Sequence, residues 1–204
     1  MNELARKSAP NRKAEIIAAC LYLSDRLGPD RMTTNDIAQA VGLSQPGIFR
    51  HFPTKQALWL AVAEDVSRRL NAAWDHALAM ADTPEARLRA LIRAQLHQIS
   101  ATPSLPMVLH SRELNIDNPA LRDAFRTKLA AFQGYLVAAL TQMQREARLR
   151  PGLSPTDAAV LLTSLVQALA IRWSLGARDF GLEEEGARLF EIQLSLMTSE
   201  KPNA

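Results

Sequence analysis

The chain of 204 residues carries a formal net charge of +3, and 48% of its residues are hydrophobic, which excludes a disordered chain and allows a sizeable core. A single cysteine, Cys20, excludes an intrachain disulfide, and its apolar neighbours at helical spacing favour a buried thiol over a redox sensor. The polar, basic start lacks the apolar segment of a signal peptide. The longest apolar run, 158–171, is too short to span a bilayer. We therefore expect a soluble cytoplasmic protein without a membrane partner.

Helical periodicity extends along the whole chain, without strand-length alternation, and predicts an all-α fold of nine helices. In chain order we expect helices over about 11–27, two short ones within 33–52, then 54–81, 84–100, a short one ending near 115, 119–149, 155–176 and 182–197. The first three helices form an N-terminal head over 1–58, and the others form a body over 59–204. No Gly- or Pro-rich linker separates the two, so the helix that begins near residue 54 is expected to couple them mechanically.

The stretch 33–58 predicts two short helices joined by a glycine turn and followed at once by a third helix. Thr33 or Thr34 is placed to cap the first helix, and Asp36 lies in its first turn, where an acid is favourable. Gly42 supplies the left-handed residue after this helix.

The second short helix has the exposed face of a DNA-reading helix. Ser44 is placed to cap it, and Pro46 lies in its first turn, where a missing N–H costs nothing. With Ile48 and Phe52 directed inward, the residues that face outward are Gln45, Gly47, Arg50 and His51. Two short helices with such a face are typical of a helix-turn-helix, which fits the major groove of DNA.

Excess positive charge is confined to the same part of the chain. Residues 1–60 carry eight Lys or Arg residues against five Asp or Glu residues, whereas the remainder carries sixteen of each. This location favours contact with phosphates. The basic residues Arg6, Lys7, Arg12 and Lys13 are expected to form an arm that becomes ordered on DNA.

The stretch resembles the TetR family of bacterial transcriptional regulators. The matching residues are Thr33-Thr34, Ile37-Ala38, Gly42, Phe49-Arg50-His51-Phe52, and Lys55 with Leu58 three positions later. The resemblance covers the N-terminal third of the chain, from Arg12 to about Leu58, and the rest matches only in its number of helices.

The resemblance implies that the head binds a double-stranded DNA operator. The residues implied at the DNA are Thr33, Thr34, Asn35, Gln45, Pro46, Gly47, Phe49, Arg50, His51 and Lys55. Gln45 suits a bidentate contact to adenine, and Pro46 suits a thymine methyl group. Arg50, His51 and Lys55 suit phosphates, although His51 is equally compatible with an ordinary histidine at a helix end.

Two positions depart from the family pattern. Phe49 stands where tyrosine is usual, so it has no hydroxyl to donate to a phosphate. Gly47 has no side chain, which favours reading of DNA shape over direct contact at that position.

The resemblance also implies that the last two helices pair with those of a second subunit in a homodimer. Apolar residues on more than one face of these helices agree with that. The expected dimer-interface residues are Leu162, Leu165, Leu169, Leu189, Ile192 and Leu196.

Within the body, the resemblance implies a pocket for an unknown small-molecule effector. The candidate lining residues are Trp74, His97, Met107, His110, Phe125, Phe132, Tyr135 and Trp173. Such an aromatic set suits an apolar pocket. The same residues at helical spacing also suit an ordinary core, and both interpretations stay open.

We therefore expect a ligand-responsive transcriptional regulator, most simply a repressor, that binds a pseudo-palindromic operator as a homodimer. The alternative is a DNA-bound protein-interaction factor without a small-molecule inducer. A closed apolar cavity would favour the first, and an exposed apolar groove over a solid core would favour the second. The sequence contains no phosphate loop, nucleophile elbow or metalloprotease motif that would indicate an enzyme, and no His or Glu-His spacing that would predict a metal site or another cofactor.

Overall fold

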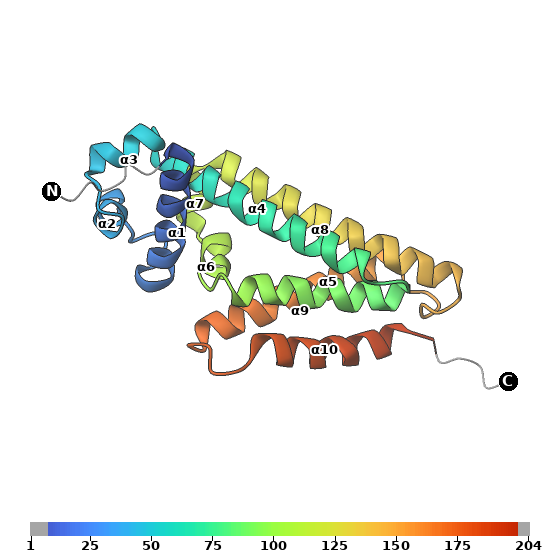
Figure 1. Ribbon diagram of the computed structural model, residues 1–204. Coiled ribbons are helices and arrows are strands. Elements are labelled where there is room, and N and C mark those ends of the chain that lie inside the picture. Colours follow the sequence, from blue (N-terminus) through green and yellow to red (C-terminus); the bar gives the residue numbers. More distant parts are fainter. Residues whose placement is uncertain (1–7, 200–204) are drawn as a thin grey trace. The chain divides into compact units, whose positions relative to one another are not determined.

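The computed structural model of the protein describes residues 8–199, and over these residues the chain is helical without a β-strand (Figure 1). The helices are α1 (Ala9–Leu27), α2 (Thr34–Ala40), α3 (Gln45–His51), α4 (Lys55–Ala79), α5 (Pro84–Ser100), α6 (Leu105–His110), α7 (Arg112–Asp117), α8 (Pro119–Arg145), α9 (Pro155–Leu175) and α10 (Leu182–Met197). The predicted all-α class is confirmed.

The structure has ten helices in its described part where the sequence predicts nine. The additional helix arises at Ser111, which separates α6 from α7 with an extended backbone. Its hydroxyl accepts a hydrogen bond from the backbone N–H of Leu114 at 3.1 Å and so caps a new helix. The predicted single short helix is therefore two.

Capping residues decide where several helices begin. The Thr33 hydroxyl accepts a hydrogen bond from the Asp36 N–H at 3.2 Å, and the Asp36 carboxylate accepts one from the Thr33 N–H at 2.8 Å, which completes a capping box for α2. The hydroxyls of Thr83 and Ser154 cap α5 and α9, and a proline follows each of them. The sequence predicts these starts correctly because the capping signals are local.

The helices group into two compact units. The first comprises the described residues up to Val66 together with Met107–Phe125, and the second comprises Ser67–Pro106 together with the described residues from Arg126 onward. Both α4 and α8 run from one unit into the other. Packing thus adds α7 and parts of α4, α6 and α8 to the head, whereas the functional division into 1–58 and 59–204 stays a prediction.

The first unit is built around a continuous apolar core. Buried members from the head are Ile16 and Cys20 of α1, Ile37 of α2, Ile48 of α3, and Phe52. Further members come from α4 and α6–α8 and include Leu58, Trp59, Val62, Val108, Leu114 and Leu121. Each large side chain buried in this way contributes about 1.5–3 kcal/mol, so the segment 107–125 is part of what stabilises the head.

The thiol of Cys20 is buried, as predicted, and burial raises its pKa to about 12. At neutral pH such a thiol is almost entirely protonated and therefore a poor nucleophile. The redox-sensor alternative has no support from this environment.

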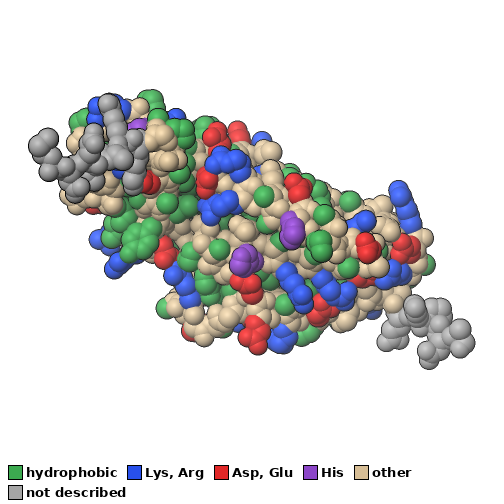
Figure 2. Space-filling view, in the orientation of Figure 1, with side chains coloured by type: hydrophobic (Ala, Val, Ile, Leu, Met, Phe, Trp, Pro, Cys, Tyr) green, Lys and Arg blue, Asp and Glu red, His purple; other side chains and the backbone are tan. Residues whose placement is uncertain are grey.

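The second unit has α5, α9 and α10 packed side by side (Figure 1). Gly186 of α10 permits close approach to α5, because a Cβ atom at this position would lie 2.5 Å from Cδ1 of Leu96. Leu96 is fully buried. On the outside, basic and acidic side chains are interspersed over α5 and α10 (Figure 2).

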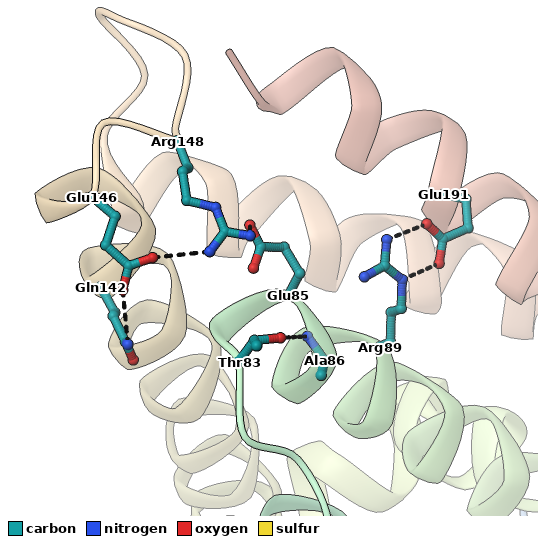
Figure 3. Close-up of polar contacts among 8 residues, drawn as sticks. All are labelled: Thr83, Glu85, Ala86, Arg89, Gln142, Glu146, Arg148 and Glu191. Atoms are coloured by element: carbon teal, nitrogen blue, oxygen red, sulfur yellow. Dashed lines mark hydrogen bonds and ion pairs between the residues drawn. The ribbon is translucent and has the colours of Figure 1, made fainter. Parts of the chain in front are cut away.

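Ion pairs fix the start of α5 against the segments around it (Figure 3). The Arg148 guanidinium, just after α8, pairs with the carboxylate of Glu85 and donates to Glu146 Oε2 at 2.9 Å. Arg89 of α5 makes two hydrogen bonds, of 2.7 and 2.9 Å, to the carboxylate of Glu191 on α10. These hydrogen bonds hold the pKa of Glu191 below its ordinary value.

Candidate nucleic-acid interface

The exposed face of α3 is set by the contacts at its two ends. Ser44 Oγ accepts a hydrogen bond from the Gly47 N–H at 3.3 Å, and the Phe52 N–H donates to the carbonyl of Ile48 at 2.9 Å. The turn before α3 contains Gly42 at φ 65°, a conformation that glycine adopts without strain. With Ile48 buried, the exposed residues of α3 are Gln45, Pro46, Phe49 and Arg50.

A hydrogen bond joins the first turns of α2 and α3. The side-chain amide of Gln45 donates from Nε2 to Thr34 Oγ1 at 2.9 Å. This bond uses one of the two amide N–H groups, so the other N–H and the carbonyl oxygen keep their capacity for a base edge. A bidentate contact to adenine needs one donor and one acceptor, and the oriented amide retains both.

Thr33 has a structural role in the capping box. Its hydroxyl donates to Asp36 Oδ2 at 2.7 Å while it accepts from the Asp36 N–H. The hydrogen bonds from the Thr33 hydroxyl and backbone N–H lower the pKa of Asp36. The first turn of α2 also contains Thr34 and the exposed Asn35. Their contacts with DNA stay predictions.

Gly47 does not face outward, so the predicted position of this residue is wrong. It is buried, and a Cβ atom there would lie 3.4 Å from both Leu43 Cβ and Ser44 Oγ. The Gly47 N–H donates to Ser44 Oγ at 3.3 Å, so this third helical residue lies against the residues that precede the helix. These are ordinary van der Waals distances, so the burial of Gly47 is a tertiary feature without a local sequence signal, and packing alone does not require glycine there.

The remaining predicted DNA residues differ in exposure. Phe49 is 38% exposed, and Arg50 is exposed, so both are accessible on α3. His51 is half-buried at the end of α3, and Lys55 is half-buried in the first turn of α4. Their contacts with DNA stay predictions.

The predicted basic arm is partly helical. Arg12 and Lys13 lie in α1, where Arg12 Nη1 donates to Glu15 Oε2 at 2.9 Å and to the carbonyl oxygen of Val41 at 3.3 Å. Lys13 Nζ lies 5.6 Å from the centroid of the Phe52 ring. Both residues thus belong to a helix without DNA, whereas Arg6 and Lys7 lie outside the described residues.

The predicted effector residues are divided between the two compact units. Trp74, Phe132 and Tyr135 do lie together in the second unit, with ring centroids 5.3 Å (Trp74–Phe132) and 5.9 Å (Trp74–Tyr135) apart. The Trp74 indole donates to Gln95 Oε1 at 3.1 Å, a contact between α4 and α5 that sequence periodicity does not indicate. Trp74 and Phe132 are buried, as expected for a core or for the wall of a closed pocket.

The other candidates are dispersed. In the second unit, His97 is exposed with Nδ1 3.2 Å from Glu183 Oε1, and Trp173 is buried with the Arg178 guanidinium 5.3 Å from its ring centroid. In the first unit, Met107 and His110 are exposed, and Phe125 packs against the core. Whether any of them contacts an effector stays a prediction.

The apolar surface of α9 and α10 differs in detail from the predicted one. Leu162 and Leu169 are buried inside the second unit, while Leu165 and Leu189 are half-buried. The exposed large apolar residues of the two helices are Val160, Leu161, Leu175, Ile192 and Leu196. Leu162 and Leu169 lie seven residues apart and so share the inward face of α9, and their predicted place in a dimer interface stays a prediction.

α9 also corrects the expectation that the apolar run is too short to span a membrane. This helix has 21 residues and a window of mean hydropathy 1.5, enough by length and composition alone, but 44% of the window is buried inside the protein. A core helix has the same properties. Over residues 8–199, no group of three or more His, Cys, Asp or Glu side chains is placed to hold a metal ion.

Comparison with known proteins agrees with this geometry. Residues 16–62 match the sequence model of the bacterial regulatory proteins of the tetR family. Over 162 residues, the chain is 30% identical to the nucleoid occlusion factor SlmA of Vibrio cholerae serotype O1, covering 76% of this chain and 79% of that protein.

Solved structures show the same fold. The ketosteroid transcriptional regulator KstR2 of Mycobacterium tuberculosis superimposes with a TM-score of 0.77 at 18% identity, covering 93% of this chain and 96% of that one. The fatty acid degradation regulator FadR from Bacillus halodurans does so with a TM-score of 0.76 at 17% identity, covering 93% and 97%. The chain therefore belongs to the TetR family of bacterial transcriptional regulators, helix-turn-helix proteins that bind DNA.

Proposed function

We propose that the protein is a transcriptional repressor that binds a pseudo-palindromic operator as a homodimer and leaves it when a small molecule binds the second unit. The observation that carries the DNA-reading part is the Gln45 amide. It is exposed on α3, oriented by Thr34, and still holds one donor and one acceptor for a base edge.

The dimer is supported by the exposed apolar side chains of α9 and α10. Leu161 is 47% and Leu196 64% exposed, which leaves apolar surface on both helices in a single chain. Two such chains would carry two heads able to read half-sites about 34 Å apart, one turn of DNA. Symmetry of the operator then follows from symmetry of the protein.

Ligand response is supported by continuity of the chain between the units. α4 and α8 both pass from one unit into the other without a break, so a change in either helix is carried along it. A ligand shifts DNA affinity only when it binds the DNA-incompetent arrangement more tightly than the competent one. The names of KstR2 and FadR associate those regulators with ketosteroids and fatty acid degradation, which favours an apolar effector here.

A second function is a DNA-bound factor that acts through another protein and has no small-molecule inducer. The 30% identity to a nucleoid occlusion factor favours it, because that relative is named for a cellular process other than metabolite response. The two functions share the DNA-binding head and differ only in what the second unit binds.

Operator affinity in the presence of candidate effectors separates the two functions. Footprinting on DNA that flanks the gene would identify the operator, and fluorescence anisotropy would then give its affinity with fatty acids, sterols and other apolar metabolites. For the repressor we expect one class to weaken binding about 5- to 150-fold, the range of ordinary allosteric coupling. A ligand that raises the melting temperature of the protein and leaves operator affinity unchanged would contradict release by ligand.

A further inference from the structure

The first unit contains a small pocket whose lining includes none of the predicted effector residues. It has a volume of about 70 Å³. Its lining residues are Asp30 between α1 and α2, Lys55, Gln56 and Trp59 on α4, Leu114 and Asp117 on α7, and Asn118 before α8. All seven belong to the same compact unit, so the pocket is defined by the packing of that unit alone.

The walls of this pocket are held by hydrogen bonds. Ser111 Oγ donates to the Asp30 carboxylate, and Asn118 Nδ2 donates to the carbonyl oxygen of Gln56 at 3.1 Å. Asn118 Oδ1 in turn accepts from the Leu121 N–H at 3.2 Å, which caps α8. A pocket whose walls are already fixed loses little entropy when it binds a ligand.

One wall residue has an unsatisfied polar group. Trp59 is 1% exposed, and its indole N–H is buried without a hydrogen-bond acceptor among the described residues. Buried N–H groups are nearly always paired, by protein or by a bound molecule. The group that this indole lacks is an acceptor, such as a carboxylate oxygen.

The charged lining residues divide by element. α4 contributes the half-buried ammonium of Lys55 together with the Trp59 indole, and both are donors. The α1–α2 connection and α7 contribute Asp30 and Asp117, exposed residues whose carboxylates are acceptors. A simple anion would face two carboxylates, and a simple cation would face Lys55, whereas a molecule with both charges satisfies both sides.

We propose that this pocket binds a small ammonium carboxylate, such as an α-amino acid of about the size of glycine. The carboxylate contacts Lys55 and the Trp59 indole, and the ammonium contacts Asp30 and Asp117. The volume accommodates roughly five non-hydrogen atoms, at about one water-sized sphere for each. The site stands whether or not the protein responds to an effector in its second unit.

The test follows the indole N–H resonances of the full-length protein by NMR. The chain has three tryptophans, so the Trp59→Phe variant identifies the Trp59 resonance by its loss. Glycine should shift this resonance saturably and leave that of Trp74 in place, because the Trp74 indole already donates to Gln95 at 3.1 Å in the second unit. Acetate and methylammonium, which each carry half of the ligand, should bind more weakly than glycine.

Variants of the charged lining residues test the assignment of roles. Asp117→Asn and Lys55→Met should each weaken glycine binding about 1.5- to 5-fold, the worth of a partly exposed ion pair. The matched control is Asp75→Asn, an exposed aspartate in the part of α4 that belongs to the second unit, and it should leave glycine binding unchanged. A dispersed Trp59 indole resonance in each variant without glycine shows that the first unit is folded, and an unshifted Trp74 resonance shows the same for the second.

Three results would overturn the proposal. One is a Trp59 resonance that does not respond to glycine, which would mean that the pocket holds water only. Another is acetate or methylammonium binding as tightly as glycine, which would refute the zwitterion. The third is glycine binding that is undiminished in both Asp117→Asn and Lys55→Met.

Discussion

Two exposed residues of α3, Gln45 and Arg50, are suited to different tasks by their chemistry. The Gln45 amide has a donor and an acceptor, which is what a single base edge requires, and Thr34 orients it. Arg50 carries a fixed charge at the end of the same helix, and a charge interacts with any phosphate regardless of sequence. We therefore expect separate side chains to carry discrimination and overall affinity.

The Gln45→Ala variant should relax discrimination at one base pair by about 1–3 kcal/mol. Arg50→Ala serves as its comparison and should weaken binding to all sequences alike, lowering the slope of affinity against salt by about one unit. Anisotropy titrations on cognate and scrambled operators at several salt concentrations measure both effects. If Gln45→Ala weakened the two DNAs equally, base reading would belong to another residue.

The capping box at α2 makes the stability of the head depend on pH. The pKa of Asp36 is lowered in the folded state by hydrogen bonds from Thr33, so its contribution is present above the unfolded pKa and is lost as pH falls through the folded one. Asp36→Ala should therefore lower the melting temperature at neutral pH, and this difference should vanish in acid. Glu64→Ala, which removes an exposed carboxylate from α4, is the control and should show a smaller difference at neutral pH. A difference for Asp36→Ala that persists below both pKa values would contradict the role of the charge.

At this scale the sequence predicts well what depends on neighbours in the chain. The caps at Thr33 and Thr83 and the turn at Gly42 follow from residues within four positions. The outward position predicted for Gly47 is wrong because its burial depends on Leu43 and Ser44 of the preceding turn lying against it. The role of Trp59 was equally inaccessible, since its unpaired indole becomes visible only when α7 is placed beside α4.

Among the elements, α9 and α10 combine a buried face with an exposed apolar one. Neighbouring leucines in α9 illustrate this, because Leu162 is fully buried whereas Leu161 is 47% exposed. Periodicity identifies an apolar helix but does not determine which of two apolar faces packs inside the subunit. The predicted interface contains the buried Leu162 and Leu169, whereas the exposed Leu161 and Leu175 are the residues that the structure leaves accessible to a second subunit.

Leu161→Glu and Leu196→Glu should each shift the protein from dimer toward monomer. Burial of a leucine side chain contributes about 1.5–3 kcal/mol, and a two-fold axis places each substitution in the interface twice. Sedimentation velocity measures the change, and Met80→Glu, at a residue 75% exposed at the end of α4, is the control. The interface would be assigned to another surface if the Met80→Glu variant dissociated as readily as the leucine variants. The same conclusion would follow if the leucine variants remained dimeric.

The pairing of α5 with the α8–α9 connection depends on Arg148 (Figure 3). Glu85 is 8% exposed, and its Oε2 has no hydrogen-bond partner among the described residues, so Arg148 neutralises a largely buried carboxylate. Arg148→Met should destabilise the protein by about 1–3 kcal/mol in urea, because it leaves that carboxylate unpaired. Arg145→Met, three residues earlier and exposed, should cost much less. Equal costs would mean that the pair contributes nothing of its own.

The boundaries of whole elements were also predictable except where tertiary packing decides them. α6 and α7 read as one short helix because the cap at Ser111 is a single serine without a proline or glycine beside it. Their membership in the first unit depends on Val108 and Leu114 joining a core formed by residues far earlier in the chain. No pattern within 105–117 carries that information.

For the whole molecule, α4, α6 and α8 each cross from one compact unit into the other, and only one of the units contains a thiol. Cys20 is fully buried with a pKa of about 12, so a thiol reagent reacts with it only after the first unit opens. The rate of labelling then reports the opening free energy of that unit alone, without any substitution.

The rate at which the buried Cys20 of the unmodified protein is labelled should consequently fall when the protein binds DNA. A ligand at a hundredfold excess over its dissociation constant adds about 2.7 kcal/mol to the opening free energy, so saturating operator should slow labelling by about a hundredfold. A scrambled duplex at the same salt concentration is the control, and equal slowing by both would indicate non-specific protection. An effector that binds only the second unit and changes the labelling rate of Cys20 would transmit its binding energy through a helix that the two units share. The reactivity of one sulfur atom would then measure the coupling between the units.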